Sequence, residues 1–168
     1  MLYVVTGPPA AGKSTWVREH AKPGDVVVDY DLIAGALSGP TPACGGTHDH
    51  RGAVRDVAFR ARSAAIREAL RHAADIDVYI IHTLPPADAL AKYAEHRAHL
   101  VTIDPGHDVV MQRIAEQRPS TARAVAKRWY SQAAKGQHGA TTATPWQGHP
   151  PGTPHPLHAP PPTTSRTW

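Results

Sequence analysis

The sequence predicts an α/β fold in which a short parallel sheet is flanked by helices on both faces, giving three layers. Four short apolar segments, rich in β-branched residues, alternate with stretches of helical character along residues 1–135. These segments are continuously apolar, which is typical of strands buried on both faces. A glycine-rich turn follows the first segment and opens the first helix, which is a recurrent feature of such sheets.

Each expected strand is followed by residues that break strand structure. The strands are expected at 2–5, 26–28, 78–81 and 100–103. They are followed by the turn at Gly7, by Asp29, by Pro85-Pro86 and by Asp104-Pro105-Gly106. The helices between and after them are expected at about 13–21, 31–37, 53–73, 86–97, 107–117 and 120–134. Strands that alternate with helices through short connections favour a parallel arrangement.

Composition excludes several classes of protein. The 168 residues suit one α/β domain with residues to spare, and a single cysteine excludes an intramolecular disulfide framework. We therefore expect a reducing, cytoplasmic compartment. No apolar run approaches the roughly 20 residues of a membrane helix, and the first residues lack the basic region of a signal peptide. The net charge of +4 is compatible with an anionic ligand but does not indicate nucleic-acid binding by itself.

The composition changes sharply near residue 136. Residues 136–168 hold 8 of the 17 prolines, 4 of the 13 glycines and 4 of the 12 histidines. After Gly139 the only long aliphatic residue is Leu157, beside Trp146 and Trp168. Such a segment buries too little apolar surface to offset the entropy of ordering. We expect a folded domain over 1–135 and a disordered, Pro/Gly/His-rich tail or linker over 136–168, which alternatively tethers a partner or a further domain.

The first turn carries a phosphate-binding motif. The stretch matches the pattern G-x-x-x-x-G-K-[ST] at every fixed position, after an expected strand and before an expected helix. Glycines allow backbone N–H groups to surround phosphate oxygens, and the helix N-terminus adds partial positive charge. The residues of this P-loop, or Walker A motif, are Gly7, Pro8, Pro9, Ala10, Ala11, Gly12, Lys13 and Ser14, and we count the following Thr15 with them as nucleotide-binding.

The motif predicts ATP and Mg²⁺ as cofactors. In P-loop proteins the lysine, here Lys13, reaches the β- and γ-phosphates, and the hydroxyl of Ser14 ligates Mg²⁺. Asp29 and Asp31 follow the second expected strand and should therefore lie near the γ-phosphate. One carboxylate can serve the metal while the other accepts the proton of an attacking hydroxyl. Asp31 alternatively acts only as a helix N-cap, a position that aspartate favours.

The segments GPPAAGKST and VVVDYD resemble P-loop kinases that include phage polynucleotide kinases and zeta toxins, among the AAA-type ATP-binding kinase-like proteins. The resemblance covers about residues 1–135 and implies a P-loop NTPase fold, for which we expect the strand order 2-3-1-4. It implies that Asp31 is the general base and that Asp29 is the preceding acidic residue. Ala34 stands where the family has an arginine that grips the acceptor, so the acceptor's identity stays open.

Two arginines after the fourth strand are assigned through the same resemblance. It implies that Arg113 packs on the adenine and that Arg118 is the lid arginine that touches the transferring phosphate, whereas the alternative for both is a solvated helix face. P-loop proteins usually hold Mg²⁺ with a carboxylate at the end of a later strand, yet the third strand here is followed by His82. Asp104 ends the fourth strand but is expected at the wrong edge of the site, and the resemblance implies that kinases of this group often lack such an acid. We therefore assign the metal role to Asp29 together with Ser14.

Two further features concern the acceptor. The segment 44–50 contains Cys44, His48, Asp49 and His50, for which metal binding, acceptor binding and a solvated loop all stay open. The expected helix 53–73 carries five arginines, of which Arg60, Arg67 and Arg71 share one stripe. This stripe either tracks a phosphate backbone or is a solvated face.

The sequence thus predicts a Mg–ATP-dependent phosphotransferase that acts on a hydroxyl of a nucleic acid or a nucleotide and has no membrane partner. Its catalytic residues would be Lys13, Asp31 and Arg118. One alternative is an ATP-binding or ATP-hydrolysing module that partners a nuclease or another protein without transferring phosphate. A small-molecule kinase is the other alternative.

Overall fold

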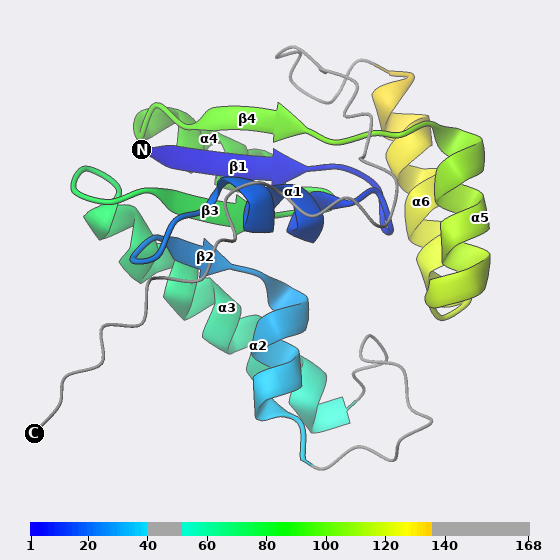
Figure 1. Cartoon of the computed structure of the whole chain (residues 1–168), viewed down its shortest axis with the longest axis horizontal. Coiled ribbons are helices and arrows are strands. Elements are labelled where there is room, and N and C mark those ends of the chain that lie inside the picture. The colour runs from blue at the N-terminus through cyan, green and yellow to red at the C-terminus, as the bar shows by residue number, and fades with distance from the viewer. Residues whose placement is uncertain (40–51, 136–168) are drawn as a thin grey trace, which may run out of the picture.

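The computed structural model describes residues 1–39 and 52–135, which form a four-stranded parallel sheet with helices around it (Figure 1). The strand order is β2-β3-β1-β4, as predicted. Leu2 lies opposite Val78 on β3, and Tyr3 lies opposite His99 on β4. The strands are β1 (Leu2–Thr6), β2 (Val26–Val28), β3 (Val78–Ile81) and β4 (His99–Thr102).

The helices occupy the expected places in the chain, with ends that differ by a few residues. They are α1 (Lys13–His20), α2 (Tyr30–Leu37), α3 (Gly52–His72), α4 (Ala87–Glu95), α5 (His107–Gln117) and α6 (Thr121–Ala133). None of the helices in the described ranges is both long and apolar enough to cross a membrane. The loop with Cys44, His48, Asp49 and His50 and the tail 136–168 lie outside the described residues.

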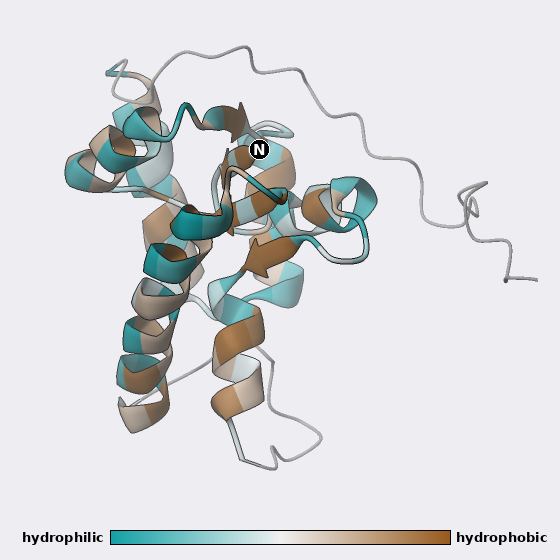
Figure 2. Cartoon of the chain, turned by 90° about the vertical axis from the view of Figure 1, so that its left-hand side faces the viewer, coloured by the Kyte–Doolittle hydropathy of each residue, from teal (hydrophilic) through white to brown (hydrophobic). Residues whose placement is uncertain are grey.

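Both faces of the sheet are buried, which explains why the strands are continuously apolar. Successive strand residues point to opposite faces. Leu2 and Val4 of β1 pack in a cluster with Ala69 of α3 and Tyr93 of α4, whereas Val5 packs on the other face with Val17 of α1. Figure 2 shows the strands in brown, the hydrophobic end of the scale, with more mixed helices around them.

The α5–α6 pair packs at the carboxyl ends of the strands and forms a third apolar cluster. Val110 and Ile114 of α5 pack with Ala126 of α6, and Ala10 of the P-loop packs against them. Asp104 fixes this pair to the sheet, because its Oδ1 accepts hydrogen bonds from the Gly106 N–H (3.0 Å) and the Tyr130 hydroxyl (2.7 Å). These bonds give Asp104 a structural role at the start of α5.

Gly7 lies where β1 turns into the P-loop, and the packing there requires a glycine. Its φ is +146°, and a Cβ at this position would lie 2.2 Å from the carbonyl oxygen of Ile103. Real Cβ atoms do not approach backbone oxygen so closely, so the two strand ends can be adjacent only because residue 7 has no side chain.

We expect Gly7→Ala to lower the melting temperature by roughly 5–10 °C, because relieving the clash must separate β1 from the residue after β4. Gly24→Ala is the matched control, since Gly24 also has a positive φ (+100°) but no atom within 4 Å of the place where a Cβ would lie. Thermal unfolding followed by circular dichroism compares the two. Equal losses in both variants would show that backbone conformation alone, and not the contact with Ile103, requires the glycine.

Candidate active site

The P-loop joins β1 to α1 and places the start of α1 at a cavity. Gly12 precedes α1 with φ 101°, and Ala10 has φ 60°, so the loop uses left-handed backbone at two positions. Among residues 1–39 and 52–135, no side chain caps α1 by a hydrogen bond. The N–H groups of the first helical turn are therefore available to an anion, and the helix dipole adds positive charge there.

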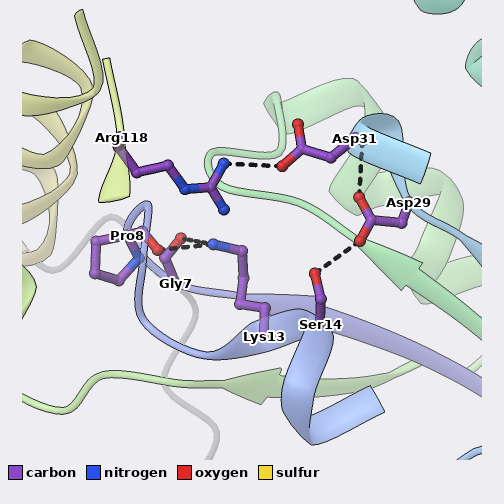
Figure 3. Close-up of polar contacts among 7 residues, drawn as sticks. All are labelled: Gly7, Pro8, Lys13, Ser14, Asp29, Asp31 and Arg118. Carbon is purple, nitrogen blue, oxygen red and sulfur yellow. Dashed lines mark hydrogen bonds and ion pairs between the residues drawn. The ribbon is translucent and has the colours of Figure 1, made fainter. Parts of the chain in front are cut away.

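Lys13 lies buried within the loop that it belongs to, with only 9% of its surface exposed. Its Nζ donates hydrogen bonds to the carbonyl oxygens of Gly7 (2.9 Å) and Pro8 (2.7 Å), as Figure 3 shows. Burial and, to a smaller extent, the nearby Arg118 lower the pKa of Lys13 to about 8, while Asp29 and Asp31 oppose the shift. An anion bound beside this ammonium would replace weak carbonyl partners with full negative charge.

Asp29 connects the P-loop helix to α2. Its Oδ2 accepts a hydrogen bond from the Ser14 hydroxyl at 2.7 Å, and its Oδ1 accepts one from the Asp31 N–H at 2.9 Å. The N-cap of α2 is therefore Asp29, and Asp31 lies in the first helical turn. The alternative that Asp31 serves only as the cap is wrong, because the β-extended backbone before the helix belongs to residue 29.

Ser14 and Asp29 provide oxygen atoms of the kind that Mg²⁺ prefers. A hydroxyl and a carboxylate lie within hydrogen-bond distance of each other, so one cation could contact both after a small adjustment. Residues 1–39 and 52–135 contain no group of three or more His, Cys, Asp or Glu side chains that could hold a metal. A magnesium ion here would therefore need phosphate oxygens and water to complete its shell, as it does in nucleotide sites.

Asp31 and Arg118 meet across the cavity. The Nη1 of Arg118 lies 2.9 Å from Oδ2 of Asp31, and both side chains are partly exposed. Arg118 follows the last turn of α5, so this ion pair ties the α5–α6 connection to the start of α2 (Figure 3). The structure thus brings both residues together beside the P-loop, while their proposed catalytic roles stay predictions.

Arg113 lies on α5 and contacts the P-loop. Its Nη1 donates a long hydrogen bond, 3.4 Å, to the carbonyl oxygen of Ala10, and the residue does not line the cavity. Adenine packing by Arg113 stays a prediction. Thr15, in contrast, lines the cavity at the start of α1.

The cavity has a volume of about 640 Å³ and extends well beyond the P-loop. One wall is the P-loop with Asp29 and Asp31, and another is the start of α6 with the residues before it. A further wall comes from α2, α3 and the residues at the end of β3, the strand next to β1. It consists of Tyr30, Phe59, Arg62, Ile81, His82, Thr83 and Leu84.

Sequence reasoning missed Arg62. The arginines singled out on this helix, Arg60, Arg67 and Arg71, are exposed and do not line the cavity, and Arg71 pairs with Glu68 at 3.4 Å. Arg62 belongs to a different face of α3. It lies four residues after the buried Ala58 and seven before the buried Ala69, so its helical phase was the signal that could have identified it.

His82 lines the same wall and is neutral. Its Nε2 lies 2.7 Å from the Tyr93 hydroxyl, and its ring is mostly buried. Burial and the neighbouring Arg62 lower the pKa of His82 to about 3. The side chain therefore acts here as a hydrogen-bonding group rather than as a charge for phosphate.

The sheet order, the glycine-rich loop and the buried lysine together define a P-loop nucleotide-binding domain. A family model for an AAA domain (AAA_33) matches residues 2–137, and the chain belongs to this family. It is therefore an ATP-binding, kinase-like P-loop module. No curated protein matches the chain.

The low pKa of Lys13 predicts proton uptake on ATP binding at alkaline pH. Phosphate favours the charged ammonium, so affinity should be flat from pH 7 to about 8 and fall by up to tenfold per pH unit above that. Calorimetry at pH 9 in two buffers of different ionisation enthalpy measures the uptake, and the same pair at pH 7 is the control. Binding without proton uptake at pH 9 would contradict a lysine pKa of about 8.

The low pKa of His82 predicts acid sensitivity of the fold. Between about pH 6.5 and 3 the unfolded chain binds a proton that the folded chain excludes, so the free energy of unfolding falls as pH falls through this window. Between pH 7 and pH 5, we expect the free energy of unfolding to fall by about 1–2 kcal/mol less in His82→Gln than in the wild type. Urea unfolding measures this, with the exposed His96→Gln as control. Parallel losses in all three proteins would exclude His82 as the cause.

Proposed function

We propose that the protein is a Mg–ATP-dependent phosphotransferase that moves the γ-phosphoryl group to a hydroxyl of a nucleic acid or nucleotide. The observation that carries this proposal is the continuous set of contacts from Ser14 through Asp29 and Asp31 to Arg118, beside Lys13 in one cavity. A site that only bound nucleotide would not need a second carboxylate beside the P-loop.

Binding of the nucleotide would use residues of the P-loop. Lys13 would transfer its Nζ hydrogen bonds from the carbonyl oxygens of Gly7 and Pro8 to the β- and γ-phosphates. The N–H groups at the start of α1 would hold the remaining phosphate oxygens. Ser14 and Asp29 would hold Mg²⁺, which neutralises charge on the phosphates when it is bound.

Transfer would use Asp31 and Arg118. Asp31 would accept the proton of the acceptor hydroxyl. At the same time the hydroxyl oxygen would form a bond to the γ-phosphorus, and the bond from the γ-phosphorus to the β-phosphate oxygen would break. Arg118 would move from Oδ2 of Asp31 to the transferring group, where its planar fork matches the spread charge. When Arg118 leaves Asp31 for the phosphate, the carboxylate of Asp31 would become available as the base. ATP binding would in this way activate Asp31.

A second candidate function is an ATP-binding or ATP-hydrolysing module that partners a nuclease or another protein. The residue at position 34 favours it. Ala34 is completely buried in α2, which packs against α3, so this position faces the interior and not the cavity. An acceptor-gripping arginine at that position, which the resemblance to P-loop kinases would require, has no counterpart here. A small-molecule kinase, the remaining alternative, would differ from both in transferring phosphate to an acceptor that is neither a nucleic acid nor a nucleotide.

Asp31→Asn should lower transfer to an acceptor by about 10²–10⁴, the usual contribution of a general base, while ATP affinity changes by only a few fold. Transfer is measured with γ-labelled ATP against 5′-hydroxyl oligonucleotides, nucleosides and water. Asp88→Asn is the matched control, because Asp88 also lies in the first turn of a helix but outside the cavity. Lys13→Ala should abolish both transfer and stabilisation by Mg–ATP.

The same assay separates the candidate functions. Label that appears only as inorganic phosphate, with every acceptor left unlabelled, would replace the kinase by the hydrolysing module. Full transfer by Asp31→Asn would require a different base.

A further inference from the structure

The cavity wall formed by α2, α3 and the end of β3 contains a cation that has no role in the proposed transfer. Arg62 reaches from α3 to the carboxyl end of the sheet, where its Nη2 donates a 2.6 Å hydrogen bond to the carbonyl oxygen of Ile81. Ile81 is the last residue of β3, the strand between β1 and β2. The guanidinium therefore lies between the ends of the two strands that carry the P-loop and Asp29.

This guanidinium is poorly compensated. Its Nε is buried and has no hydrogen-bond acceptor in the described parts of the chain, and Arg62 forms no ion pair with a carboxylate there. Arg118, in contrast, is paired with Asp31. Burial lowers the pKa of Arg62, while Tyr93 and Asp29 oppose the shift, and an arginine keeps its proton in proteins. A partly buried charge that is not paired with a carboxylate is costly, so a ligand anion at this position would be favourable.

The residues around Arg62 indicate the chemistry of such a ligand. His82 beside it is neutral and donates or accepts only hydrogen bonds, so Arg62 is the charged group of this wall. Phe59 lies one turn earlier on the same side of α3, lines the cavity and is 63% exposed. A flat apolar ring next to a guanidinium suits a molecule that combines a planar base with an anionic group.

We propose that Arg62 binds a phosphate group of the phosphoryl acceptor and so determines specificity for acceptors that already carry one phosphate. The hydroxyl to be phosphorylated would face Asp31, the existing phosphate would face Arg62, and the base would pack on Phe59. This inference rests on the proposed kinase function for the identity of the second ligand. It assigns acceptor recognition to α3 in a chain where position 34 of α2 is a buried alanine.

The test measures binding and needs no transfer. The full chain is saturated with Mg²⁺ and a non-hydrolysable ATP analogue so that the P-loop is filled, and thymidine 3′-phosphate and thymidine are then titrated by calorimetry. We expect thymidine 3′-phosphate to bind at least tenfold more tightly than thymidine. Equal affinities, or no binding of either compound, would overturn the proposal.

Variants at position 62 separate charge from structural support. Arg62→Gln keeps a polar N–H donor but removes the charge, and should reduce the preference for the phosphorylated probe to less than threefold. Arg62→Lys keeps the charge and should retain part of the preference. The matched control is Arg67→Gln, an exposed position on the same helix that does not line this cavity. An unchanged preference in Arg62→Gln would overturn the proposal.

Two readouts keep this proposal distinct from the proposed function. Unchanged stabilisation of each variant by the ATP analogue shows that the fold and the P-loop are intact. If labelled ATP never transfers phosphate but the Arg62-dependent preference persists, the kinase function fails and the acceptor-side phosphate site stands. If transfer occurs with no dependence on Arg62, the site fails and the kinase function stands.

Discussion

The site depends on one carboxylate, that of Asp29, which joins the first helix of the fold to the second. One oxygen accepts from the Ser14 hydroxyl and the other from the Asp31 N–H, so a single side chain sets the position of α1 relative to α2. Asp29 is only 6% exposed, and both its bonds are short. Because this carboxylate also caps α2, it fixes the direction in which Asp31 and its partner Arg118 enter the cavity.

Three cationic side chains of the cavity differ in the groups that they contact. Lys13 is held by neutral carbonyl oxygens, Arg118 by Asp31, and Arg62 by a single carbonyl oxygen. Burial makes each exchange of such a partner for a phosphate oxygen more favourable than it would be in water. We therefore expect anions to bind at the P-loop and at the Arg62 wall, with Asp31 in the same cavity.

Much of this was predictable from local patterns. Continuously apolar segments and the residues after them predicted the strands, and the sheet order β2-β3-β1-β4 was confirmed. The spacing from Gly7 to Ser14 predicted the phosphate loop, because a loop that surrounds phosphate with backbone N–H groups imposes glycine at set positions. The position of Asp29 after a strand predicted that it would lie beside Ser14, since the carboxyl ends of parallel strands share one edge of the sheet.

The sequence by itself determined the strands, the P-loop and the position of both aspartates directly after β2, because each depends on residues that are close along the chain. Only the tertiary structure decided which arginines reach the site. The Asp31–Arg118 pair joins residues 87 positions apart. The helical phase of Arg62 differs from that of the other arginines of α3, but only the packing of α3 decided which of its faces meets the cavity. An arginine is exposed by default, so only the packing of the helix that carries it determines whether it lines a cavity or faces solvent.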